Sequence, residues 1–170
     1  WLAEVVREVA LALAHAHERG VLHRDVKPQN VLVDGEGRAR LLDFGLARAL
    51  EGGSELTASG QMLGTPAYMA PEQAVAGEVG APADVYALGA LLYYILVGRP
   101  PFTGPTALNV VHKILAEEPV APRTLDRTIP RALETICLLA MSKEPERRYA
   151  TAKALAEDLD RFLAGDPVLA

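Results

Sequence analysis

The first residues of the chain place apolar side chains at the spacing of one helical face, at Leu2, Val5, Val6, Val9, Leu13 and Ala16. This pattern predicts a helix that runs to about Arg19 and ends at Gly20, because glycine readily takes the left-handed conformation that closes a helix. Trp1 already falls inside the pattern, and no capping residue precedes it. We therefore interpret the chain as a piece of a longer protein.

Two short runs of strand-forming residues follow the helix, at 31–33 and 39–42. The sequence Asp-Gly-Glu-Gly at 34–37 joins them and is typical of a tight turn, so the pattern predicts a small β-hairpin. Residues 43–82 are rich in Gly, Ser, Thr, Ala and Pro and have little periodicity. They predict a long loop of the kind that is functional or mobile.

A helix beginning after Pro82 is apolar on nearly every face, with side chains at Val85, Leu88, Leu91, Leu92, Ile95 and Leu96. Such a helix lies at the centre of a domain, and we expect it to end at Gly98. Three further helices are predicted at about 106–117, 131–142 and 152–164, the last closed by Gly165. The sequence thus predicts a mostly helical domain around a buried central helix.

Composition limits what such a domain can do. The chain has 170 residues, 50% of them hydrophobic, which suffices for one core; we assign residues 1–165 to one domain and 166–170 to the start of a tail or linker. A net charge of −5 gives no general electrostatic footprint for nucleic acid. The longest apolar stretch, 87–97, is about half of the ~20 residues of a membrane span, so no membrane segment is expected in this piece. The lone Cys137 excludes an internal disulfide and fits the reducing cytoplasm, although the full-length parent could be membrane-anchored.

Polar groups of several kinds are concentrated in residues 23–30, which read HRDVKPQN. An acid, Asp25, and an amide, Asn30, precede the predicted hairpin, and a second acid, Asp43, follows it. Because a hairpin returns the chain to its starting point, we expect Asp43 near Asn30 and Asp25. Carboxylate and amide oxygens suit Mg²⁺, which takes its other ligands from water and substrate phosphates. Phosphoryl transfer is the reaction that needs this set.

Three motifs, in this order, resemble those of the eukaryotic-like protein kinases. Residues 23–30 resemble the catalytic loop of that family, Asp43-Phe44-Gly45 its metal-binding loop, and Ala70-Pro71-Glu72 the end of its activation segment. The resemblance implies the fold of the C-terminal lobe of a kinase, which is the mostly α part of an α+β fold, with a small hairpin carrying the catalytic and metal-binding loops.

The likeness extends over nearly the whole chain, through residues 64–68 and 84–89 to Arg148. Lys27 and the pair Gly64-Thr65 resemble the serine/threonine branch of the family, in its bacterial form. The resemblance therefore implies a serine/threonine protein kinase.

The resemblance also implies a role for each residue of the site. Asp25 would accept or orient the proton of a substrate hydroxyl, and Lys27 would steady the transferring γ-phosphate. Asn30 and Asp43 would hold Mg²⁺, and Leu32 would form part of the floor under the adenine ring. ATP and Mg²⁺ are the implied cofactors, and a protein with a Ser or Thr hydroxyl is the implied substrate.

Other residues receive structural or regulatory roles. Arg24 would meet a phosphorylated residue of the activation segment, for which Thr57 and Ser59 are candidates, although both hydroxyls also fit a merely solvated loop. Thr65 would contact Asp25 and Lys27. The implied structural residues are His23 packed on Phe44, an ion pair of Glu72 with Arg148, and also Gly45 and Asp84.

Simpler interpretations compete for some of these features. Gly35 and Gly37 are not followed by the third glycine of a nucleotide-binding loop, so a hairpin turn explains them. The side chains of His15 and His17 point about 200° apart on a helix and cannot easily share a metal. For His23, catalysis as a general base is the less favoured alternative to packing.

Two functions from different classes remain. The first is the catalytic lobe of a serine/threonine kinase whose N-terminal lobe lies upstream of Trp1, and the second is a non-catalytic binding or regulatory module. This sequence has no Gly-rich phosphate loop, strand lysine or helix glutamate of the kind that kinase catalysis needs, so the isolated piece is expected to have little or no activity. The presence of Asp25, Lys27, Asn30 and Asp43 favours the enzyme, because a docking module needs none of them in a cleft.

Overall fold

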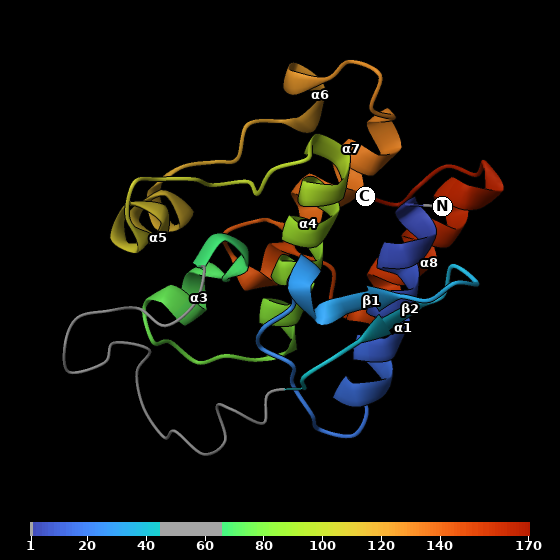
Figure 1. Ribbon diagram of the computed structural model, residues 1–170, viewed down its shortest axis with the longest axis horizontal. Coiled ribbons are helices and arrows are strands. Elements are labelled where there is room, and N and C mark those ends of the chain that lie inside the picture. The colour runs from blue at the N-terminus through green and yellow to red at the C-terminus, as the bar shows by residue number, and fades with distance from the viewer. Residues whose placement is uncertain (1, 45–65) are drawn as a thin grey trace.

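The computed structural model describes residues 2–44 and 66–170, and within them the chain is mostly helical, as predicted (Figure 1). The longer helices are α1 (Leu2–His17), α4 (Ala81–Val97), α5 (Ala107–Ala116), α7 (Arg131–Ala140) and α8 (Ala152–Ala164). The short helices are α3 (Pro71–Ala74) and α6 (Pro122–Leu125), and the strands are β1 (Val31–Val33) and β2 (Ala39–Leu41). Short 3₁₀ turns lie at Pro28–Asn30, Pro66–Tyr68 and Pro145–Arg147.

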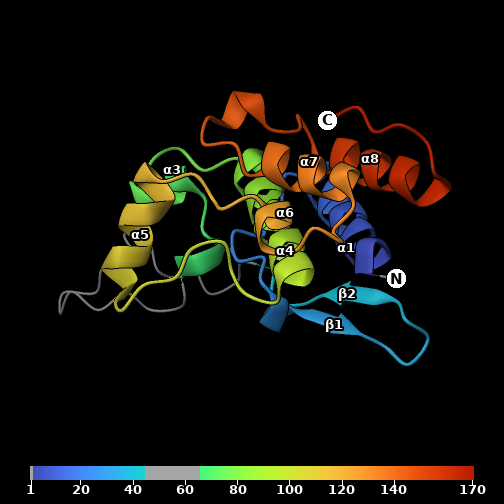
Figure 2. The ribbon, with the colours of Figure 1, turned by 90° about the horizontal axis from the view of Figure 1, so that it is seen from above.

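Helix α4 is the centre of the molecule. Its residues from Ala83 to Tyr93 are all buried, which confirms the prediction from its apolar pattern. In two perpendicular views it lies between the pair α1 and α8 on one side and the pair α3 and α5 on the other (Figures 1 and 2). Gly98 ends the helix with a φ of 77°, a conformation that a residue without a Cβ adopts easily. No helix among the described residues has both the length and the apolarity to span a bilayer.

Helix α1 buries one face against α8 and α4. Val6, Val9 and Leu13 are fully buried, which is the face that the sequence pattern predicted. The helix ends at His17, slightly before the predicted position, because residues 18–20 form a turn. This packing places the start of the polar segment 23–30 beside the first turn of α4.

The hairpin of β1 and β2 confirms the predicted pairing, with Val31 opposite Leu41 and Val33 opposite Ala39. Strand β2 packs on α1, where the carboxylate of Glu8 accepts a hydrogen bond from the backbone N–H of Ala39. The second strand ends at Leu41, one residue earlier than predicted. The hairpin is therefore attached to the helical lobe along its second strand, which fixes the segments that enter and leave it.

Two short helices were not predicted. Helix α3 lies within residues 43–82, which the sequence pattern assigned to a loop, and α6 lies in the connection between α5 and α7. Each begins with a proline at its first position and has four residues, too few to show a periodic pattern. The loop prediction is thus wrong for residues 71–74 and also for 81–82, where α4 has already begun; residues 45–65 lie outside the part of the chain that the structure describes.

Candidate active site

The polar segment 23–30 connects α1 to β1 with a partly buried backbone. Val26 is only 1% exposed and anchors the segment in the core. The side chains on either side of it stay accessible, 48% exposed for Asp25 and 24% for Lys27. Pro28 begins the 3₁₀ turn, where its missing N–H costs no hydrogen bond. The segment therefore has a fixed backbone and accessible charged groups.

The two carboxylate oxygens of Asp25 have different surroundings. Oδ2 accepts hydrogen bonds from Lys27 Nζ at 2.7 Å and from Asn30 Nδ2 at 3.1 Å. Oδ1 has no hydrogen-bond partner among the described residues. Asn30 Nδ2 also donates to the backbone carbonyl of Asp25 at 2.8 Å, which closes the turn. One oxygen is held by the protein, and the other is open to a proton donor.

The buried carboxylate of Asp84 holds the backbone that leads to Asp25. Asp84 is 1% exposed in the first turn of α4 and accepts the backbone N–H of His23 at 2.9 Å and of Arg24 at 2.7 Å. His17 Nε2 lies 2.7 Å from the same carboxylate and donates to it. Arg24 has a φ of 67°, in the left-handed region that a residue with a Cβ rarely adopts, so its conformation depends on these bonds.

His23 uses both ring nitrogens within the protein. Nε2 lies 2.8 Å from the carbonyl of Leu42, which requires the proton on Nε2, and Nδ1 accepts the N–H of Asp25 at 3.2 Å. The ring is fully buried and meets the ring of Phe44 edge to face, with 4.9 Å between centroids. A ring with both nitrogens occupied is not a general base, so the geometry favours packing over catalysis.

The chain that leaves β2 returns to the polar segment. Leu42 N–H donates to the carbonyl of Asn30 at 2.8 Å, and Phe44 contacts His23. Asp43 lies between these two contacts, with an exposed side chain and a left-handed φ of 56°. The hairpin thus brings Asp43 back to the neighbourhood of Asn30, as its topology predicted.

The oxygens of Asn30 and Asp43 suit Mg²⁺. Both hydrogen bonds of the Asn30 side chain to described residues use its nitrogen, which leaves the amide oxygen to act as a ligand. Together with the carboxylate of Asp43 it could supply a pair of hard ligands, the kind of pair that Mg²⁺ completes with water and phosphates. Residues 2–44 and 66–170 contain no cluster of three His, Cys, Asp or Glu side chains able to hold a metal ion by themselves.

A buried ion pair holds α3 against the start of α4. Arg148, whose side chain is 0% exposed, binds Glu72 with two hydrogen bonds of 2.7 and 2.8 Å. Its guanidinium also donates to the carbonyls of Pro82 and Lys143, and its centre lies 5.1 Å from the ring of Tyr86. Burial raises the pKa of Tyr86 far above its ordinary value, so this ring stays neutral. The position of α3 is therefore determined by the core.

The other residues expected at the site take no part in the contacts described above. Leu32 lies on β1 with 51% of its surface exposed. Gly45, Thr57, Ser59 and Thr65 lie outside the described residues.

Sequence reasoning missed two residues that contact the site. For His17 the sequence analysis excluded a metal shared with His15 but gave no partner; the signal for its role is the acid Asp84, which needs buried donors in a helix that is otherwise apolar. Gln73 donates to the backbone carbonyl of Arg24 at 2.9 Å. Nothing in the local sequence indicates that contact, because the two residues lie far apart in the chain.

Comparison with known proteins agrees with this geometry. The sequence pattern described as the protein kinase domain matches residues 2–159. The chain belongs to the protein kinase family. The resemblance inferred from the three motifs is thereby confirmed, and the helical lobe described above is the C-terminal lobe of a kinase domain.

Several curated kinases are similar to this kinase lobe. It is 38% identical over 165 residues to the serine/threonine-protein kinase PknB of Mycobacterium tuberculosis, covering 96% of this chain and 26% of PknB. It is 46% identical over 145 residues to RqkA, a DNA damage-responsive serine/threonine-protein kinase of Deinococcus radiodurans, covering 85% of this chain and 22% of RqkA. A probable serine/threonine-protein kinase of Streptomyces coelicolor, SCO3848, is 38% identical over 166 residues, or 97% of this chain and 25% of the relative. The chain spans about a quarter of the length of these relatives.

Proposed function

We propose that this chain is the catalytic lobe of a serine/threonine protein kinase that transfers the γ-phosphate of ATP to Ser or Thr hydroxyls of proteins. The observation that carries the proposal is the carboxylate of Asp25, with one oxygen held by Lys27 and Asn30 and the other open. An alcohol is a poor nucleophile near neutral pH, so the reaction needs a positioned group that orients the hydroxyl and accepts its proton.

Each residue of the site has a separate role in this reaction. Asp25 Oδ1 accepts the proton of the substrate hydroxyl and directs the oxygen toward the phosphorus. Lys27, 2.7 Å from Asp25, brings a positive charge to the place where negative charge develops. Asn30 and Asp43 would hold Mg²⁺, which neutralises charge on the phosphates when it is bound. Leu32 offers an exposed apolar surface to the adenine ring.

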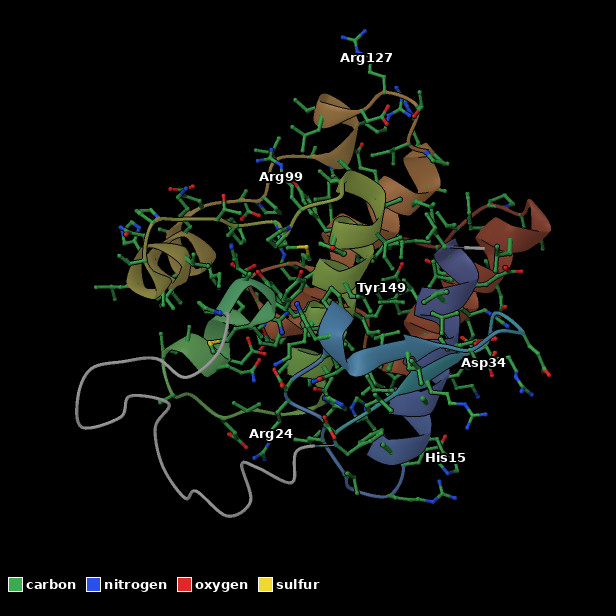
Figure 3. All side chains as sticks on the ribbon, viewed as in Figure 1. His15, Arg24, Asp34, Arg99, Arg127 and Tyr149 are labelled. Atoms are coloured by element: carbon green, nitrogen blue, oxygen red, sulfur yellow. The ribbon has the colours of Figure 1, made fainter. Side chains whose placement is uncertain are left out.

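Regulation through Arg24 belongs to the same proposal. Its backbone is held by Asp84, and its side chain is exposed and lies below α4 in the view of Figure 3. A guanidinium there matches a phosphorylated Thr57 or Ser59, because it binds phosphate through two parallel hydrogen bonds. Thr65, by the same resemblance, would contact Asp25 and Lys27.

The proposal also requires groups that this sequence does not contain. Kinase catalysis uses a Gly-rich turn over the phosphates, a strand lysine and a helix glutamate. We propose that the coding sequence upstream of Trp1 supplies them as an N-terminal lobe, with residues 1–165 as the C-terminal lobe and 166–170 as the start of a further segment. Sequencing that region of the source DNA is the first experiment, and an unrelated segment in place of these groups would favour a non-catalytic binding module.

The 170-residue chain alone is expected to bind Mg-ATP weakly and to have negligible turnover, because several positioning and charge-stabilising groups are absent together. Titration calorimetry with Mg-ATP and a phosphate-transfer assay on a Ser/Thr peptide measure this. Clear transfer by the wild-type 170 residues that Asp25→Asn abolishes would contradict the expectation.

The parent protein, expressed from its own start codon, provides the decisive assay. Asp25→Asn removes the proton acceptor and should lower kcat by a factor of about 10² to 10⁴. Glu144→Gln, a change at a surface ion pair remote from the site, is the control and should leave kcat unchanged. An Asp25→Asn protein as active as the wild type would overturn the assignment.

A further inference from the structure

Helix α3 reaches the catalytic loop through one side chain. The amide nitrogen of Gln73 donates to the backbone carbonyl of Arg24 at 2.9 Å, and its oxygen accepts the backbone N–H of Ala70 at 3.0 Å. The first bond crosses from α3 to the residue directly before Asp25, and the second holds the side chain at the start of its own helix. The two ends of the amide therefore have separable tasks.

The backbone that Gln73 contacts needs support. Arg24 is in the left-handed region, and the N–H groups of His23 and Arg24 are both held by Asp84. The peptide group between Arg24 and Asp25 is held at both ends, since its N–H donates to His23 Nδ1 and its carbonyl accepts from Gln73. A peptide group is planar, so fixing its carbonyl limits rotation of the bond that leads into Asp25.

The helix that carries Gln73 is held in place by contacts with the rest of the lobe. The adjacent Glu72 is bound by the fully buried Arg148, and α3 packs on α5. The amide of Gln73 is therefore mounted on a helix whose place is set by the core, and displacement of α3 would displace the Arg24 carbonyl with it.

We propose that Gln73 is a positioning residue for phosphoryl transfer, which acts by holding the carbonyl of Arg24 and thereby the direction in which Asp25 presents its carboxylate. The inference rests on the function proposed for Asp25. In this proposal α3 supports the catalytic loop through a direct hydrogen bond, in addition to the ion pair that anchors the helix.

The role predicts a split between kinetic constants. Loss of the bond lets the peptide group before Asp25 rotate, so Oδ1 meets the substrate hydroxyl in the reacting geometry less often. We expect kcat to fall about three- to tenfold, the range of one hydrogen bond of ordinary strength. The KM for ATP should stay within about twofold, because Asn30 and Asp43 are not touched by the change.

Two substitutions separate the two ends of the amide. Gln73→Met removes both hydrogen bonds with little change in size. Gln73→Glu keeps an acceptor for the N–H of Ala70 but places a carboxylate oxygen against the Arg24 carbonyl, where a donor is needed. Thr135→Val is the matched control, since it removes a side-chain hydrogen bond to the carbonyl of Arg131 on α7, remote from the loop.

The kinetic constants and the melting temperatures of these three variants test the proposal. In the parent protein, Gln73→Glu and Gln73→Met should both lower kcat at constant KM for ATP, with Thr135→Val unchanged. Wild-type kcat in Gln73→Glu would show that the residue only caps α3, and wild-type kcat in Gln73→Met would overturn the proposal outright. A parallel loss of kcat and melting temperature in all three variants would mean a general structural effect and would also overturn it.

Hydrogen exchange followed by NMR on the 170-residue chain tests the contact without any activity. The amides of Arg24 and Asp25 should exchange about three- to tenfold faster in both Gln73 variants and at the wild-type rate in Thr135→Val. Unchanged exchange in the Gln73 variants would overturn the inference even if the parent is an active kinase. Faster exchange combined with an inactive wild-type parent would instead contradict the proposed function and leave the contact established.

Discussion

Gly89 allows the central helix α4 to approach α7 more closely than a larger residue would permit. A Cβ at this position would lie 2.8 Å from the Cβ of Ala140, 2.8 Å from the Cγ of Met141 and 3.2 Å from the carbonyl oxygen of Cys137. The thiol of Cys137 also donates to the Gly89 carbonyl at 3.4 Å. The single missing methyl group is thus what lets two core helices meet here.

Gly89→Ala is expected to destabilise the chain by about 1–3 kcal/mol, because an extra methyl group in a packed core forces its neighbours apart. Each kcal/mol lowers the melting temperature by about 2–4 °C in a chain of this size, which thermal unfolding followed by circular dichroism resolves. Gly35→Ala is the control, since a Cβ there meets nothing within 4 Å. Equal melting temperatures for the two variants would show that α4 and α7 can separate without cost.

At the scale of elements, the four-residue helix α3 is held in place by an ion pair with a residue outside the helix. Its Glu72 side chain is 13% exposed and binds the 0% exposed Arg148, which follows the Pro145–Arg147 turn. A buried guanidinium that loses its carboxylate keeps the cost of desolvation. The ion pair therefore joins α3 to the distant segment between α7 and α8.

Glu72→Gln should reduce the free energy of unfolding by about 3 kcal/mol, because it leaves the buried charge of Arg148 without its counter-ion. Glu144→Gln breaks the exposed pair with Arg147, at 3.7 Å and side-chain exposures of 59% and 76%, and should change it by less than about 0.5 kcal/mol. Urea unfolding of both variants measures the difference. A similar small loss in each would mean that Arg148 is stabilised by its backbone carbonyl partners alone.

The hairpin carries a local pH dependence at Asp34, which Figure 3 shows at the far end of the strands. Backbone hydrogen bonds from Arg38 and Glu36 and the side chain of Arg38 hold the pKa of Asp34 below its ordinary value. A lowered pKa in the folded state means that the stabilisation is complete above the unfolded pKa of about 3.9 and is lost as the pH falls through the folded value.

We expect the amides of Glu36 and Arg38 to begin losing protection from hydrogen exchange as the pH falls below the unfolded pKa of about 3.9, and to lose it fully below the lowered pKa of Asp34 in the folded chain. Asp34→Asn keeps an acceptor but cannot ionise, so its hairpin should show no such transition. A wild-type turn that is equally protected at pH 2.5 and pH 6 would contradict this account.

At the scale of the whole molecule, the fold continues past the part that matches the kinase family. The family match ends at residue 159, whereas α8 runs to Ala164 and the chain then turns back at Gly165. The backbone N–H groups of Leu169 and Ala170 donate to Asp158 at 2.7 and 2.9 Å, and Tyr149 donates to the same carboxylate at 2.8 Å. Residues 166–170, expected to begin a tail or linker, are therefore bound to the lobe at their far end.

Deletion of residues 166–170 from the 170-residue chain should lower the free energy of unfolding by about 2–4 kcal/mol, because Asp158 is 1% exposed and loses two donors. Leu169→Ala is the control: that side chain is 76% exposed, and the substitution keeps the backbone N–H. Denaturant unfolding compares the two. A deletion as stable as the control would show that the returning segment contributes nothing to the stability of the lobe.

Local pattern determined much of this protein. The apolar faces of α1 and α4, the hairpin turn at 34–37 and the helix ends at Gly98 and Gly165 depend on neighbouring residues, and all were predictable from spacing and turn chemistry. The return of Asp43 to Asn30 also followed from the hairpin, and the motif order indicated the kinase family.

Tertiary structure alone decided which distant groups meet. Three hydrogen-bonded contacts join segments that lie far apart in the sequence, so that no local pattern predicts them. They are His17 with Asp84, Gln73 with Arg24, and Asp158 with the end of the chain. Such contacts arise because burial of the helices around α4 brings polar groups out of water, and each then needs a partner from whatever segment packs beside it. The side chains to which we assign the chemistry were visible in the sequence, and the bonds that orient them became visible only in the folded chain.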